Sequence, residues 1–152
     1  MNDIVIDFSK VHRINVFGIT VLEPSTVLSS LAMTAICLYA FFRLNKPRHA
    51  HRMNQQTRYF FLFMAIATAI GGVLGHGFLY LTGQLGKIPG WFASMIAVAL
   101  FERAAIRHIA PLLPQRGGVL LGWLNYAELV IFFVLTLLTL NFMVVEIHAF
   151  YG

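Results

Sequence analysis

His76 is the first residue in the sequence whose type and setting suggest chemistry. It stands in an apolar run from Arg58 to Gly83 that holds no Asp, Glu, Lys or Arg between its ends. Lipid contains no water to solvate an ionisable side chain, so an imidazole in such a run is a candidate functional group. A single hydrogen bond between helices would account for His76 equally well, and the sequence leaves both interpretations open.

Three more polar residues are expected near the level of His76 if the apolar runs cross a membrane in alternating directions. They are Glu23, at the start of the first run, and Glu146 and His148, at the end of the last. Carboxylate and imidazole groups are ligands that zinc and iron accept. These four residues are the candidate metal site, with zinc as the candidate cofactor, although no HExxH, ExxH or CxxC spacing supports it.

A second polar layer is expected deeper in the third and fourth apolar runs. Glu102 and Arg103 lie about 10 Å inside the inner end of the third run, at about 1.5 Å of helix per residue. Asn125 and Glu128 lie at a similar depth in the fourth run. Because neighbouring antiparallel helices bring equal depths together, we expect Arg103 to form a buried ion pair with Glu128, Glu102 or both.

Helices must position these groups, because the composition excludes a soluble domain. Of the 152 residues, 59% are hydrophobic and only 11% are charged, and a soluble domain could not bury so much apolar surface. We therefore expect a single transmembrane domain over residues 1–152, an all-α integral membrane four-helix bundle. Its helices are expected at about 24–44, 58–83, 89–110 and 119–147.

The distribution of charge predicts how these helices are threaded. The stretch from Arg43 to Arg58 is the most basic part of the chain, whereas residues 84–90 hold one charge, Lys87. Short basic loops stay in the cytoplasm, so we expect both ends of the chain outside a cell membrane. Residues 2–22 should form a short extended or hairpin segment at the membrane surface. The net charge of +5 then indicates membrane lipids as the partner rather than nucleic acid.

Three glycines of the second run, Gly71, Gly72 and Gly75, form a face of small residues on a helix. In a bilayer, packing drives helix association, and small residues let a neighbouring backbone approach closely. We expect this face to pack against another helix of the chain or of a partner subunit.

Two short segments resemble a known pattern. Phe17-Gly18-Ile19 and Glu23-Pro24-Ser25-Thr26 precede the first helix, and Gly71-Gly72 with His76-Gly77-Phe78 lies in the second. Over residues 17–80 they resemble an uncharacterised family of bacterial multi-span membrane proteins. That family is distantly similar to the alkaline ceramidase and progestin/adipoQ receptor superfamily of membrane hydrolases.

The resemblance implies a protein of the bacterial inner membrane, with Glu23 as the acid at the head of the first helix and His76 as a zinc-binding histidine. Those hydrolases place a serine four residues before the histidine, where this chain has Gly72. They also take further zinc ligands from a seventh helix, whereas four are expected here.

Three functions of different classes follow from these observations. The leading one is a structural or accessory subunit of a membrane assembly, which packs against other transmembrane subunits or against itself. The second is a metal-dependent membrane hydrolase of a lipid amide or ester, with a zinc site centred on His76. The third is a small proton-coupled carrier that uses Glu102, Arg103 and Glu128. The sequence assigns no catalytic residue.

Overall fold

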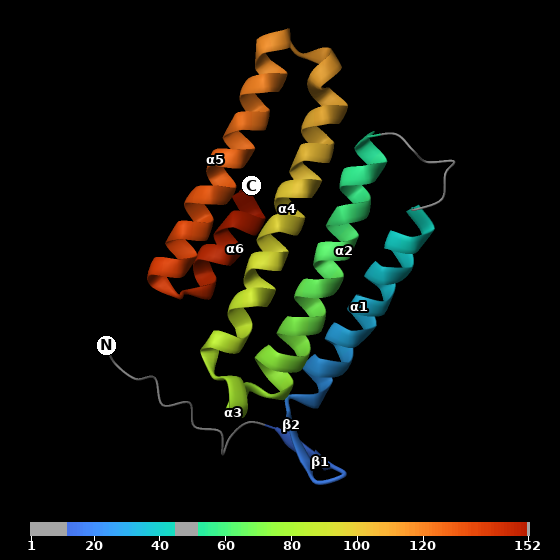
Figure 1. Ribbon diagram of the computed structural model, residues 1–152, viewed down its shortest axis with the longest axis vertical. Coiled ribbons are helices and arrows are strands. Elements are labelled where there is room, and N and C mark those ends of the chain that lie inside the picture. The colour runs from blue at the N-terminus through green and yellow to red at the C-terminus, as the bar shows by residue number, and fades with distance from the viewer. Residues whose placement is uncertain (1–11, 45–51, 152) are drawn as a thin grey trace.

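Four long helices lie side by side in one row in the computed structural model, which describes residues 12–44 and 52–151 (Figure 1). They are α1 (Pro24–Leu44), α2 (Arg52–Gly72), α4 (Ile88–Ile109) and α5 (Gln115–Thr139). Each is long and apolar enough to cross a membrane. The all-α class is therefore confirmed, and so is the presence of four helices of membrane-spanning length and composition. Residues 1–11, and residues 45–51 of the basic connection, lie outside the described residues.

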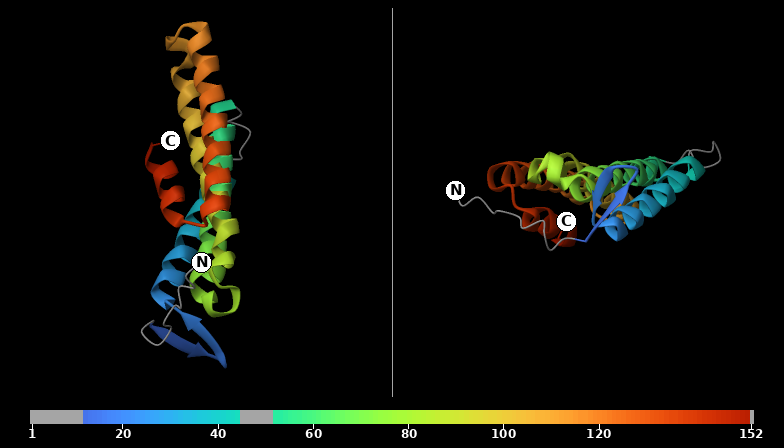
Figure 2. Two further views of the ribbon diagram at one scale, coloured as in Figure 1. Left: turned by 90° about the vertical axis from the view of Figure 1, so that its left-hand side faces the viewer. Right: turned by 90° about the horizontal axis from the view of Figure 1, so that it is seen from below.

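The row is open rather than closed into the expected bundle. Helix α2 packs against α1 on one side and α4 on the other, and α5 packs against the far side of α4. Views at right angles show a flat layer with α1 and α5 at opposite edges (Figure 2). The apolar window of each edge helix is only 6% buried, against 28% for α2 and α4, so the edges leave most of their apolar surface uncovered.

A β-hairpin precedes the first long helix, as the sequence predicts. Strands β1 (Arg13–Val16) and β2 (Ile19–Leu22) are antiparallel, with Val16 paired to Ile19. Phe17 and Gly18 form the two-residue turn with φ of 52° and 83°. Positive φ at both turn positions matches the right-handed twist of the strands. The hairpin lies beyond the ends of the helices and leads directly into α1 (Figure 1).

The second apolar run is not one helix to residue 83. Helix α2 ends at Gly72 and continues as a π-helical turn, η3 (Val73–Gly77), in which the Phe78 N–H donates to the Val73 carbonyl over 2.9 Å. Short helices α3 (Leu79–Thr82) and η4 (Gln84–Lys87) then lead into α4. Glycine is a poor helix former, and the glycines of this segment permit the wider turn.

The fourth apolar run is two helices in place of the single one expected over 119–147. Helix α4 joins α5 through the turn η5 (Ala110–Leu112), and α5 ends where Leu140 takes a φ of 49°. The Asn141 side chain then accepts the Met143 N–H over 3.0 Å at the start of α6 (Phe142–Tyr151). The 25 residues of α5 already rise about 38 Å, more than the apolar core of a membrane requires. After the turn at Leu140, helix α6 runs back beside α4 and α5 (Figure 1).

Candidate functional site

The first polar pair joins the hairpin end of α1 to the π-helical turn. The Nδ1 of His76 lies 2.7 Å from Oε2 of Glu23, and both side chains are about one-third exposed. Glu23 takes an unusual φ of 45°, and its N–H donates to the His12 carbonyl over 2.8 Å. The hairpin thus fixes the position of Glu23 at the start of α1. The extra residue of the π turn directs His76 toward it. The structure brings together these two residues of the predicted outer layer.

A pocket of about 670 Å³ opens beside this pair. His76 lines it, and the other lining residues come from η4, from the start of α4 and from the α5–α6 turn: Gln84, Lys87, Trp91, Thr139, Leu140, Asn141 and Phe142. Its polar groups include an ammonium, an imidazole and two carboxamides. The pocket suits a polar or anionic group at the end of the helical layer.

The other two residues of the predicted outer layer do not join His76. Because α6 turns back, Glu146 is exposed and lines a separate pocket with Met143, Ile147 and Phe150. His148 is buried, with 1% of its surface exposed. Its ring packs edge-on against Phe132, with 5.2 Å between the two ring centres. Among the described residues, His76 has one metal-ligating neighbour, Glu23, fewer than the three protein ligands that zinc sites use.

The second polar layer forms between α4 and α5, but not as a direct ion pair. The Arg103 Nε donates to Oδ1 of Asn125 over 2.6 Å, and the Asn125 amide donates to Oε2 of Glu102. The guanidinium carbon of Arg103 also lies 3.5 Å from the ring centre of Tyr126. Among the described residues, no salt bridge joins Arg103 to either carboxylate. Asn125, which is 4% exposed, therefore stands where a carboxylate was expected.

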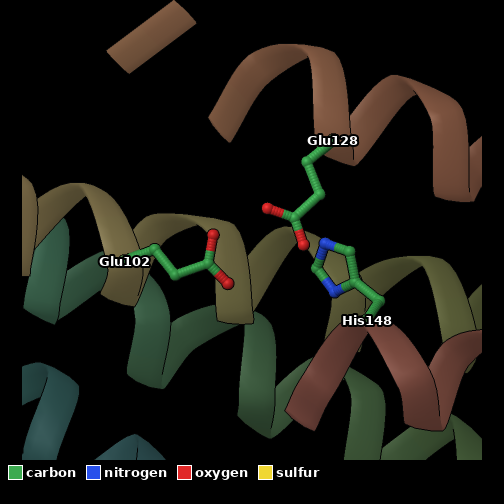
Figure 3. A group of neighbouring side chains, drawn as sticks. All are labelled: Glu102, Glu128 and His148. Atoms are coloured by element: carbon green, nitrogen blue, oxygen red, sulfur yellow. The ribbon is translucent and has the colours of Figure 1, made fainter. Parts of the chain in front are cut away.

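His148, on α6, also lies next to this polar layer. Glu102 on α4, Glu128 on α5 and His148 on α6 each offer one ligand atom, and these atoms all lie within 4.8 Å of one another. Figure 3 shows the Glu128 carboxylate beside the imidazole ring and the Glu102 carboxylate pointing toward the same space. Three helices thus bring two acids and an imidazole to one point.

Sequence reasoning placed Glu102 and Glu128 at one depth but missed His148 as their neighbour. The signal that could have found it is Thr139-Leu140-Asn141, a small polar interruption in an otherwise apolar run. Asparagine is a preferred residue at helix starts, and α5 was already long enough to span. A second helix beginning after Asn141 would have returned His148 to the depth of the carboxylates.

The fold and these polar groups define a helical protein with four helices able to cross a membrane. The chain belongs to a family of unknown function, DUF6962, whose profile matches residues 25–152. The matched range contains His76, Glu102, Glu128 and His148, whereas Glu23 precedes it. No curated protein and no solved structure matches the chain.

Proposed function

We propose that the chain is a multi-pass protein of a cell membrane, the bacterial inner membrane, and that it acts there as a structural or accessory subunit of a membrane assembly. The observation that carries this proposal is the open row of helices, whose edge helices expose apolar side chains along their length. In water such a surface would aggregate, whereas lipid or a neighbouring transmembrane helix covers it.

Helix α1 carries the surface best suited to a neighbouring helix. Its side chains toward α2 include the buried Cys37, while Ser25, Ser29 and Ala32 are exposed. Residues 25, 29 and 32 are three and four positions apart and therefore share one face. Small residues at that spacing allow close approach of another helix in a membrane. The Ser29 hydroxyl donates to the Thr26 carbonyl of the same helix over 3.0 Å, so it adds little bulk to this face. A second transmembrane segment is the occupant proposed here.

Photo-crosslinking in membranes tests this subunit role. A photoreactive amino acid at Ser29 should give a protein adduct, because that position lies at the centre of the small-residue face. The matched control carries the same photoreactive amino acid in place of Leu31, which is exposed on a different side of α1. This variant should react mainly with lipid. An adduct of twice the chain mass identifies a second copy, and another mass identifies a different subunit. Lipid adducts alone at both positions would contradict the proposal.

A lipid amide or ester hydrolase is the second candidate, and the contact between Glu23 and His76 favours it. With Nδ1–H donating to Glu23 over 2.7 Å, Nε2 of the neutral ring is free to accept a proton from water. The adjacent pocket, which contains Lys87, suits the polar head of a lipid. In this candidate His76 is the general base and Glu23 orients its ring. Among the described residues, His76 has only Glu23 as a metal-ligating neighbour, so this candidate includes no zinc.

Release of fatty acid from lipid esters and amides by the purified protein tests the hydrolase. His76→Gln should abolish release, and Glu23→Gln should lower it by about 10²–10⁴-fold, the range of general base catalysis. His108→Gln, which changes an exposed histidine of α4, is the control and should retain full activity. Equal release by the wild type and His76→Gln would assign the activity to a contaminant.

A further inference from the structure

The cluster of Glu102, Glu128 and His148 contains polar atoms that have no partner. Both ring nitrogens of His148 and Oε1 of Glu102 are buried and make no hydrogen bond. A buried polar atom without a partner costs about 1–3 kcal/mol, so a histidine that leaves two in this state requires an explanation. The ring packs edge-on against Phe132, with 5.2 Å between the ring centres. It also lies beside the Glu128 carboxylate, and the Glu102 carboxylate points toward the same space (Figure 3).

The negative charge at this point is only partly compensated. Glu102 and Glu128 together carry two negative charges when ionised, and the nearest described cation, Arg103, is bonded to Asn125 and lies over Tyr126 instead of bridging them. Carboxylates within an apolar layer are costly unless a partner neutralises them. One divalent cation would balance both acids and accept a lone pair from the neutral imidazole.

We propose that Glu102, Glu128 and His148 bind a divalent first-row transition metal ion, of the class of zinc, manganese and iron(II). Two oxygen ligands and one nitrogen ligand match the preferences of these ions. Ligand atoms around zinc are about 2.0–2.2 Å from the metal, which places them about 3–3.6 Å apart in a tetrahedral site. The atoms here lie within 4.8 Å, so small side-chain rotations would complete the shell.

The surroundings hold the acid ligand on α4 in place. The Asn125 amide donates to Oε2 of Glu102 and leaves Oε1 free to face the ion. Such outer-shell hydrogen bonds fix the orientation of metal ligands. Three protein ligands also leave one tetrahedral position open, as in zinc sites that bind water or substrate. The site belongs to the junction of α4, α5 and α6, and it is separate from the pair formed by Glu23 and His76.

Metal binding by the purified, chelator-treated protein tests the site, with Zn²⁺ as the probe. We expect about one zinc per chain by elemental analysis after gel filtration. Glu128→Gln and His148→Phe should each weaken binding by more than about 100-fold, because loss of an outer-shell partner alone costs about 10–100-fold. Phenylalanine keeps the ring beside Phe132, so His148→Phe preserves the packing of α6.

Two matched controls separate this site from the alternatives. Glu146→Gln changes an exposed acid two residues from His148, and His76→Gln changes the histidine of the outer pair; both should bind zinc as the wild type does. Substitution by Co²⁺ gives a second readout, a visible absorption band that Glu128→Gln should lose. Stoichiometric zinc in both Glu128→Gln and His148→Phe, or no zinc in the wild type, would overturn the assignment. Loss of zinc in His76→Gln with retention in Glu128→Gln would do the same.

Discussion

Replacement of Arg103 by leucine is expected to lower the free energy of unfolding by about 3 kcal/mol, the cost of removing one partner from a buried charged network. Leucine removes the donor to Asn125 and, with it, the guanidinium that lies near Glu102 and over Tyr126. The Asn125 carbonyl oxygen is then buried without a donor, and Glu102 loses the nearby positive charge. Thermal unfolding in detergent measures the loss.

Arg107→Leu is the matched control for this change. It removes an arginine from the same helix one turn further on, where the side chain is exposed. Exposed charges contribute little to stability, so its unfolding temperature should stay close to that of the wild type. Equal stability of the wild type and Arg103→Leu would show that the network between α4 and α5 does not stabilise the fold.

Gly72→Ala is expected to destabilise the contact between α1 and α2 by about 1–3 kcal/mol, the usual cost of overpacking. A Cβ at residue 72 would lie 2.3 Å from Cβ of Ser30. The neighbouring Gly71→Ala is the control, because its Cβ would meet no atom within 4 Å. Alanine is the better helix former, so Gly71→Ala should be neutral or stabilising by up to about 1 kcal/mol.

A double-mutant cycle identifies the clash as the cause. In a Ser30→Gly background the obstructing Cβ is absent, and the next atom, Cα of Ser30, lies 3.7 Å away, an ordinary contact. Gly72→Ala should therefore cost little in that background. Two results would contradict this explanation: an equal cost of Gly72→Ala in the Ser30→Gly and wild-type backgrounds, or equal stability of Gly71→Ala and Gly72→Ala. Either would show that glycine at residue 72 is not required for the close approach of α1 and α2.

Much of the architecture could be read from hydropathy, because a membrane-spanning helix is a long and simple signal. The four apolar runs and the matching depths of Glu102, Arg103 and Asn125 required only counting along helices. The outer layer was less predictable. The depth argument grouped His76 with Glu23, and the structure places Nδ1 of His76 2.7 Å from Oε2 of Glu23. The same argument placed Glu146 and His148 beside them because it assumed that the last helix is uninterrupted.

That assumption failed for a local reason. The position of His148 depends on one residue, Leu140, whose φ of 49° is unfavourable for a branched side chain and is not indicated by its type. The prediction of a direct ion pair for Arg103 was also wrong. The depth argument could not distinguish an amide from a carboxylate at equal depth. Asn125 and Glu128 occupy neighbouring positions on α5, and the packing of α4 selects Asn125 as the partner of Arg103.

The turn at Leu140 also implies an order of assembly. Helix α6 has ten residues, too few to cross a bilayer unaided, so it can enter the apolar layer only against helices that are already inserted. The hairpin of α4 and α5 must therefore form before α6 docks, and the two acids must meet before His148 reaches them. During synthesis, the last described helix therefore completes the cluster.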